Sequence, residues 1–193
     1  IARVRVGVVG DFCLDVYWFL DPSASEPSLE TGLPTQPVRD QRCSLGGAGN
    51  VACNLSAMGC RHVAAFAVIG DDPWGREMAA LLEAAGASTQ GLLVQTQDWA
   101  TPAYVKPYEG EHEHPRLDFG NFNRLADATA ALLLDRIEQA LPALDVLIIN
   151  QQVRQGLHTE TFRRGLAARM QQREKPIFIV DSRHYSDAYP AAH

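Results

Sequence analysis

Short apolar runs alternate with segments of helical periodicity along most of this chain. Four runs are almost continuously apolar: "VRVGVV" at 4–9, "HVAAFAVI" at 62–69, "DVLIIN" at 145–150 and "PIFIVD" at 176–181. A strand that is covered on both faces needs no polar alternation, so such runs are typical of buried strands in a parallel sheet.

Apolar residues at helical spacing fill the segments between these runs. The predicted helices span residues 47–58, 73–85, 127–141 and 159–173. Asp127 is the expected N-cap of the third helix, and the pair Asp71-Asp72 before Pro73 is expected to cap the second. The alternation of strands and helices predicts an α/β fold with a mostly parallel sheet covered on both sides.

Two segments break this alternation. Residues 17–42 hold four of the eleven prolines and show no helical period, and residues 101–120 have the pattern of a hairpin that turns near Glu109-Gly110. We expect both to be extended excursions that form a small β lid over one edge of the domain. A pair of surface loops is the alternative, although long loops without structure are uncommon in compact domains.

Three glycines stand at the start of the first predicted helix, in "CSLGGAGNVACNLSAMG" at 43–59. Gly46, Gly47 and Gly49 each cost roughly 1 kcal/mol if they lie inside a helix. One interpretation is a tight turn that needs positive φ angles. The other is functional: a backbone without side chains lets a ligand approach the positive end of the helix. Gly59 is the expected C-terminal stop.

Composition narrows the classes of function. The apolar fraction of 46% in 193 residues is typical of a globular domain. A net charge of −6 without runs of Lys or Arg argues against a nucleic-acid or anionic-membrane surface. No apolar segment approaches the roughly 20 residues that span a bilayer. Nothing resembles a signal peptide, and four cysteines without a CxxC pair favour free thiols in the cytoplasm.

Polar residues end the four apolar runs: Asp11, Asp71, Asn150 and Asp181. Ligands of open parallel sheets bind beyond the carboxyl ends of the strands, so these side chains are expected to face one crevice. Turn and cap roles are the alternative for each residue taken singly. Asp11 and Asp15 flank an apolar loop, "DFCLD", and two carboxylates there suit hydrogen bonding to a polyol.

Other candidate motifs carry less weight. "EHEH" at 111–114 fits a solvated hairpin tip better than a metal site. The sequence contains no GxxxxGK[ST], GxSxG or HExxH motif.

Six stretches of the chain, taken together, resemble the PfkB (ribokinase-like) carbohydrate kinases. They are "VVGDFCLDVYW", "LGGAGNVACNLSAMG", "VIGDDPWGREMAALLEAAGAST", "TPAYVKPYEGEHEHPRLDF", "DVLIIN" and "PIFIVDSR". The "GDFCLDVYW" opening and the glycine spacing are most similar to the heptose-kinase branch. The motifs present are those of the N-terminal two-thirds of such a kinase. The resemblance implies a ribokinase-like αβα sandwich with a small β lid. Residues 1–193 would then be one partial domain, with core segments 1–14, 43–98 and 121–193 and lid segments 15–42 and 99–120.

The resemblance also implies the roles of individual residues. Asp15 and Asn50 would bind sugar hydroxyls, with Asp11 and Gly47 in the same pocket, and Gly46-Gly47 would be the hinge between lid and core. Further candidates for substrate contact on the lid strands are Lys106, Arg116 and Asp118. For the full-length protein the resemblance implies ATP and Mg²⁺, a small-molecule sugar substrate and a homodimer through the lid.

The sequence departs from the family pattern in two places. "NQQVRQG" at 150–156 stands where heptose kinases carry a D-Y-x-K-G segment. The family's N-x-x-E and G-A-G-D motifs do not occur, and the latter supplies the anion hole and the catalytic base. We therefore expect no catalytic residue and no metal ligand in this chain, which would supply the sugar-binding part of an ATP-dependent kinase acting on a sugar or sugar-phosphate hydroxyl.

Two other functions stay open. One is a non-catalytic sugar-binding relative that lacks the phosphotransfer site. The other is an unrelated doubly wound nucleotide-binding domain, which the absence of GxGxxG after the first run disfavours.

Overall fold

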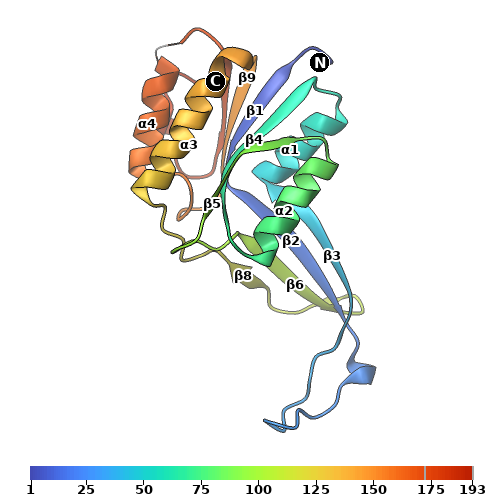
Figure 1. Cartoon of the computed structure of the whole chain (residues 1–193). Coiled ribbons are helices and arrows are strands. Elements are labelled where there is room, and N and C mark those ends of the chain that lie inside the picture. Colours follow the sequence, from blue (N-terminus) through green and yellow to red (C-terminus); the bar gives the residue numbers. More distant parts are fainter. Residues whose placement is uncertain (172, 193) are drawn as a thin grey trace.

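A parallel sheet of five strands forms the centre of the molecule (Figure 1). The computed structural model describes residues 1–171 and 173–192. The strands, in the order β10-β9-β1-β4-β5 across the sheet, are β1 (Arg5–Gly10), β4 (His62–Gly70), β5 (Ser88–Gln95), β9 (Val146–Gln151) and β10 (Ile177–Ser182). The predicted α/β fold is confirmed. Strand β5 escaped the sequence prediction because it lies at the sheet edge, where "STQGLLVQ" mixes buried and exposed positions.

Two helices cover each face of this sheet (Figure 1). On one face lie α3 (Asp127–Ala140) and α4 (Glu160–Gln171), and on the other α1 (Ala48–Ala57) and α2 (Pro73–Ala84). The first layer buries large side chains such as Leu133, Leu147 and Phe162, and the second buries Val8, Met78 and Leu82. All four predicted helices form, and residue 172 of the fourth lies outside the described residues. No helix in the described ranges is long and apolar enough to cross a membrane.

The helix ends match most of the predicted signals. Gly47 is the N-cap of α1 and has a φ of +53°, which confirms the turn interpretation at that glycine. Gly59 follows α1 with a φ of +81°. Asp72 caps α2 by accepting from the Gly75 amide at 2.7 Å. The N-cap prediction for Asp127 was wrong: Ala126 holds that position, and Asp127 is the first helical residue, where a carboxylate still favours the helix dipole.

A second sheet projects from one end of the core (Figure 1). Its path is β3-β2-β6-β7, with β8 also paired to β6. The strands are β2 (Phe12–Leu20), β3 (Val38–Gly47), β6 (Ala103–Glu109), β7 (His112–Glu113) and β8 (Leu117–Phe119). Strand β2 pairs antiparallel to β3 and parallel to β6. The hairpin predicted near Glu109-Gly110 is confirmed, with β6 and β7 on either side of the turn.

The loop predicted at "DFCLD" was wrong. Phe12 begins strand β2 directly after β1 ends, with Asp11 alone between them. Phe12, Leu14 and Val16 alternate and are all buried against α1 and α2, so the segment follows the period of two that a half-buried strand requires.

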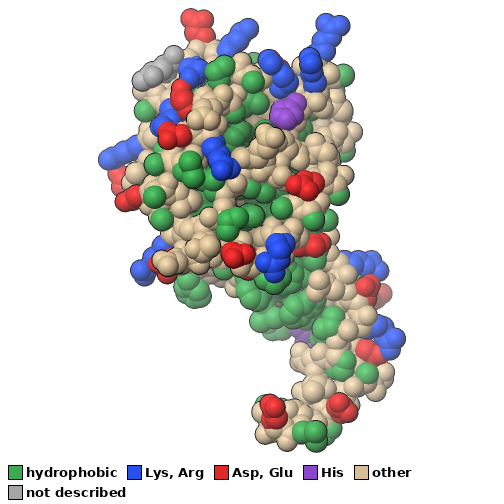
Figure 2. Space-filling view, viewed as in Figure 1, with side chains coloured by type: hydrophobic (Ala, Val, Ile, Leu, Met, Phe, Trp, Pro, Cys, Tyr) green, Lys and Arg blue, Asp and Glu red, His purple; other side chains and the backbone are tan. Residues whose placement is uncertain are grey.

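The chain between β2 and β3 extends far from the core (Figure 1). It contains a short 3₁₀ helix, Pro22–Ala24, and a bridge between Pro27 and Pro34. Figure 2 shows hydrophobic side chains gathered where the second sheet leaves the core. Leu117 and Phe119 of β8 are exposed on this sheet, which gives it an apolar surface open to solvent.

Candidate functional site

Three strands of the parallel sheet bring polar groups together at their carboxyl ends. The Asn150 side-chain amide donates to Asp181 Oδ2 at 2.7 Å. The Asn150 carbonyl oxygen accepts from the Asp11 amide at 3.0 Å. Asp71 does not join them. Of the four residues expected to face one crevice, only Asp11 lines the cavity described below, so the prediction was wrong for Asp71, Asn150 and Asp181. Asp71 is exposed and pairs with Arg76 of α2 at 3.7 Å, because β4 leads directly into that helix.

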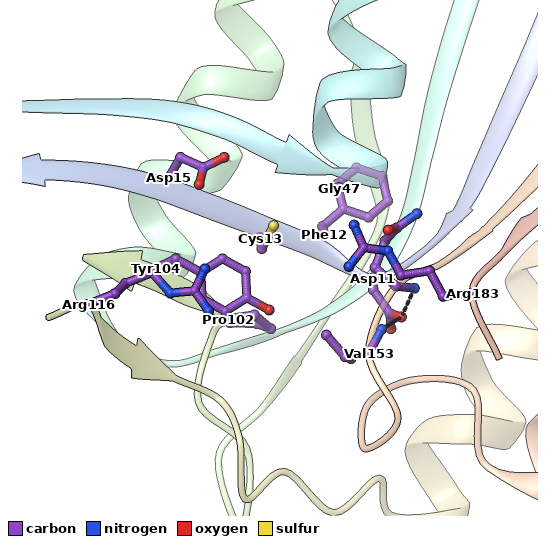
Figure 3. Close-up of a pocket in the computed structure, with 11 residues that line it drawn as sticks. Asp11, Phe12, Cys13, Asp15, Gly47, Pro102, Tyr104, Arg116, Val153 and Arg183 are labelled. Carbon is purple, nitrogen blue, oxygen red and sulfur yellow. Dashed lines mark hydrogen bonds between the residues drawn. The ribbon is translucent and has the colours of Figure 1, made fainter. Parts of the chain in front are cut away.

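A cavity of about 280 Å³ opens between these strand ends and the second sheet (Figure 3). It is lined by Asp11, Phe12, Cys13, Asp15, Gly47, Pro102, Tyr104, Arg116, Gln152, Val153 and Arg183. Three predicted site residues, Asp11, Asp15 and Gly47, therefore share one cavity. Its wall combines carboxylates and guanidinium groups with aromatic and aliphatic surface, which is the make-up of a site for a small polar molecule.

Asp11 holds the segment after β9 in place. Its carboxylate is buried, and Oδ2 accepts from the backbone amides of Gln152 at 2.7 Å and Val153 at 3.0 Å. Two backbone donors to one carboxylate oxygen are charge-assisted hydrogen bonds, which are stronger than neutral ones. Asp11 therefore shapes one wall of the cavity through the backbone as well as lining it.

Asp15 and Lys106 form a partly buried ion pair on neighbouring strands. Lys106 Nζ donates to Asp15 Oδ1 at 2.8 Å, and the side chains are 19% and 29% exposed for Lys106 and Asp15. Partial burial lowers the pKa of the ammonium, but the hydrogen bond and the charge of Asp15 outweigh it, so the pKa is raised overall. Lys106 is therefore charged at neutral pH and lies behind Asp15, outside the set of cavity-lining residues.

Arg116 reaches the cavity from the segment just before β8. Its guanidinium donates to both carboxylate oxygens of Asp118, at 2.5 and 2.8 Å, and lies 4.5 Å from the centre of the Tyr104 ring. Arg116 lines the cavity and Asp118 does not, so Asp118 orients Arg116 from behind. The bidentate pair fixes the plane of the guanidinium.

Two further groups on the wall stay protonated at neutral pH. Burial raises the pKa of the Cys13 thiol to about 12, and the negative charges of Asp15 and Asp11 raise it further in the same direction. Burial likewise raises the pKa of Tyr104 to about 12. Both groups can therefore offer a hydrogen-bond donor to a ligand, and neither is a nucleophile at neutral pH.

Gly46, Gly47 and Asn50 connect the second sheet to α1. Gly46 pairs with Cys13 at the end of β3, and a side chain at Gly47 would overlap the Asp11 carbonyl oxygen. Asn50 is exposed on α1, accepts from Asn54 at 3.4 Å and is not among the cavity-lining residues. Its contact with a sugar stays a prediction.

Several lining residues escaped the sequence analysis. Tyr104 and Arg183 are the polar ones with the clearest chemistry, and Figure 3 shows the Arg183 side chain next to Asp11. The signal for Arg183 was present, because it stands two residues after Asp181 at the end of a predicted strand. Nothing in the sequence marked Tyr104, which enters the site only because β6 pairs with β2.

A buried histidine supports the strand ends from behind. His158 Nδ1 lies 2.8 Å from the Tyr189 hydroxyl and Nε2 lies 3.3 Å from the Asn150 carbonyl oxygen. Burial lowers the pKa of His158, so the ring is neutral. The tautomer that satisfies both contacts has Nε2 donating to Asn150 and Nδ1 accepting from Tyr189.

The hairpin tip is separate from this site. His112 and His114 approach each other at 5.0 Å between ring centres, and His114 lies 3.4 Å from Glu109. Within residues 1–171 and 173–192, no group of three or more His, Cys, Asp or Glu side chains could hold a metal ion.

Comparison with known proteins identifies the family of this chain. The sequence profile described as pfkB family carbohydrate kinase matches residues 9–192, almost the whole chain. The chain belongs to the pfkB family of carbohydrate kinases. Membership confirms the resemblance seen in the glycine cluster and the strand ends.

Relatives and solved structures agree with this membership. The "Bifunctional protein HldE" of Gluconobacter oxydans is 26% identical over 97% of this chain and 38% of its own length. That of Chromohalobacter salexigens is 34% identical over 77% of this chain and 30% of its own length. Among structures, a ribokinase from Cryptococcus neoformans var. grubii in complex with ADP has a TM-score of 0.59 at 17% identity. That match covers 95% of this chain and 50% of the ribokinase chain.

A ribokinase from Thermotoga maritima gives a similar match. Its TM-score is 0.55 at 18% identity, over 92% of this chain and 52% of that chain. The predicted ribokinase-like fold is thereby confirmed. The chain spans about half the length of these ribokinase chains and less than two-fifths of the two HldE relatives.

Proposed function

We propose that this chain supplies the acceptor site of an ATP-dependent kinase that phosphorylates a hydroxyl of a sugar or sugar phosphate. The observation that carries the proposal is the cavity between the two sheets, which joins Asp11 and Asp15 to Arg116 and Arg183. Carboxylates accept hydrogen bonds from hydroxyl groups, and guanidinium groups donate to sugar oxygens or to a phosphate. The ring of Tyr104 offers an apolar face for the C–H groups of a sugar.

The second sheet would act as a lid over this cavity. Strand β3 runs into α1 through Gly46 and Gly47, and the φ of +53° at Gly47 is one that other residues rarely adopt. We place the hinge at these glycines, with the core and lid segments divided as the sequence predicts. Closure would exclude water from the reacting groups and so limit hydrolysis of ATP.

ATP as the phosphoryl donor follows from family membership. Magnesium would neutralise charge on the transferred phosphoryl group when bound. The residues that line the cavity would bind and orient the sugar. Free thiols and the use of ATP agree with a cytoplasmic location, which stays a prediction.

A non-catalytic sugar-binding relative is the second candidate. Both candidates need the same sugar site, and they differ only in phosphoryl transfer.

Sugar affinity should depend on Asp15. Asp15→Asn removes a charged acceptor, which should weaken binding by roughly 1.5–3 kcal/mol. Isothermal titration with D-fructose, D-sedoheptulose 7-phosphate and adenosine, one probe for each substrate class, measures the loss. Asn50→Ala tests the second predicted sugar ligand, with an expected cost of roughly 0.5–1.5 kcal/mol.

The matched control is Asp40→Asn, which removes an exposed carboxylate from β3 on the same sheet. It should leave the affinity unchanged. Equal affinities for Asp15→Asn and the unmodified protein, with the fold intact, would reject Asp15 as a sugar ligand.

We also propose that two lids associate to form a homodimer. Leu117 and Phe119 of β8 are exposed and, two residues apart on one strand, lie on the same face of the second sheet. Burying this apolar surface would favour association. Light scattering should give twice the mass of one chain, and Phe119→Ser should lower it. Leu132→Ser, an exposed position on α3, is the control. A monomer at high concentration would contradict the dimer.

A further inference from the structure

The register of the second sheet places Asp15 between two neighbours. Side chains alternate across a strand, and Leu14 and Val16 of β2 are buried in the core. Asp15 therefore points to the opposite face, toward the cavity that it lines. Lys106 lies on β6 and Gly46 on β3, the two strands that pair with β2 on either side.

These two neighbours enclose the Asp15 carboxylate. Lys106 Nζ donates to Oδ1 at 2.8 Å. On the other side, a Cβ atom at Gly46 would lie 2.7 Å from Oδ2 and 2.8 Å from Cys13 Sγ. Real Cβ atoms do not approach an oxygen or a sulfur so closely, so the Asp15 carboxylate and the Cys13 thiol occupy space that a side chain at residue 46 would need. Gly46 has no positive φ, and its backbone alone therefore does not require glycine.

We propose that Lys106 is a positioning residue for Asp15, and that Gly46 leaves the space that the Asp15 carboxylate occupies together with the Cys13 thiol. This inference rests on the proposed function, in which Asp15 binds a sugar hydroxyl. Lys106 lies outside the cavity lining, so it acts on the sugar through Asp15. An ion pair with both partners partly buried is held more firmly than one on the surface. A carboxylate that is fixed in this way loses little conformational freedom when the sugar binds, and this favours affinity.

A double-mutant cycle tests whether Lys106 acts on sugar binding through Asp15. The probes are D-fructose, D-sedoheptulose 7-phosphate and adenosine, titrated into the single and double variants of Asp15→Asn and Lys106→Met. Lys106→Met alone should weaken binding about tenfold, and Lys106→Arg should recover most of the loss. In the Asp15→Asn background, Lys106→Met should change the affinity by less than about twofold.

The outcomes separate this inference from the proposed function. Additive effects of the two substitutions would mean that Lys106 contacts the sugar itself, which overturns the positioning role. Loss of affinity in Asp15→Asn without any loss in Lys106→Met overturns it as well. No effect of Asp15→Asn, or no binding of any probe, would instead contradict the proposed function.

A measurement without ligand tests the geometry directly. The carboxyl ¹³C resonance of Asp15, identified by its loss in Asp15→Asn, should move in Lys106→Met and in Gly46→Ala. It should stay in place in Arg42→Met, which removes an exposed cation from β3 of the same sheet. An unmoved resonance in Lys106→Met, at an unchanged unfolding temperature, would show that Lys106 does not hold the carboxylate.

Discussion

Residues 1–193 alone should give no measurable sugar-dependent ADP from ATP and magnesium. The family resemblance implies that the catalytic base and the anion hole come from a G-A-G-D segment, which these residues lack. The carboxylates in the cavity do not replace it: Asp11 accepts from two backbone amides, and Asp15 pairs with Lys106. Losing one hydrogen-bond donor to developing negative charge lowers the rate by roughly 10²–10³, so losing the whole anion hole should abolish turnover.

The assay measures ADP release with hexoses, heptose phosphates and nucleosides, on this chain and on a longer protein that includes a G-A-G-D segment. Binding of the same sugars by titration serves as the control that the acceptor site is intact. Turnover by residues 1–193 near the rate of the longer protein would refute the expectation. A base would then be sought among the carboxylates that line the cavity, Asp11 and Asp15.

The second large effect is expected on the free energy of unfolding, when Gly10, the residue before Asp11, is replaced by alanine. A Cβ atom at Gly10 would overlap the carbonyl oxygen of Asn150, and the φ of +157° is one that other residues rarely adopt. The obstacle is backbone on the neighbouring strand β9, which cannot move without breaking the pairing of β1 and β9. Gly10→Ala should therefore lower the free energy of unfolding by about 4 kcal/mol.

Gly7→Ala on the same strand is the matched control. Its Cβ atom would meet side chains and no backbone: Leu144 Cδ1 at 2.7 Å, Leu147 Cδ1 at 2.8 Å and the Phe66 ring at 3.2 Å. Such overpacking should cost about 1–3 kcal/mol, because the leucines can shift. Urea denaturation measures both free energies. A Gly10→Ala variant no less stable than Gly7→Ala would show that the strand end adapts more easily than its geometry indicates.

The glycine cluster shows how far a local pattern can be interpreted. The sequence left open whether Gly46 and Gly47 serve a turn or a ligand. The structure gives the two residues different reasons: Gly47 has a positive φ at the start of α1, whereas Gly46 leaves room for the Asp15 carboxylate and the Cys13 thiol. The second reason depends on a contact between β2 and β3, which no spacing within the cluster could indicate.

The sequence by itself determined the core of the α/β fold, because apolar runs and helical periods are local consequences of burial on both faces of a parallel sheet. It also indicated Asp11, Asp15 and Gly47 as site residues, because strand ends and glycine clusters can be recognised in the sequence alone. Only the tertiary structure decided which side chains meet. Tyr104 enters the cavity because β6 pairs with β2, and Lys106 lies behind Asp15 for the same reason. Asp71 stays outside because β4 leads directly into α2. Pairing between distant strands sets these positions, and the register of such pairing is fixed by packing of the whole domain rather than by the residues of any one segment.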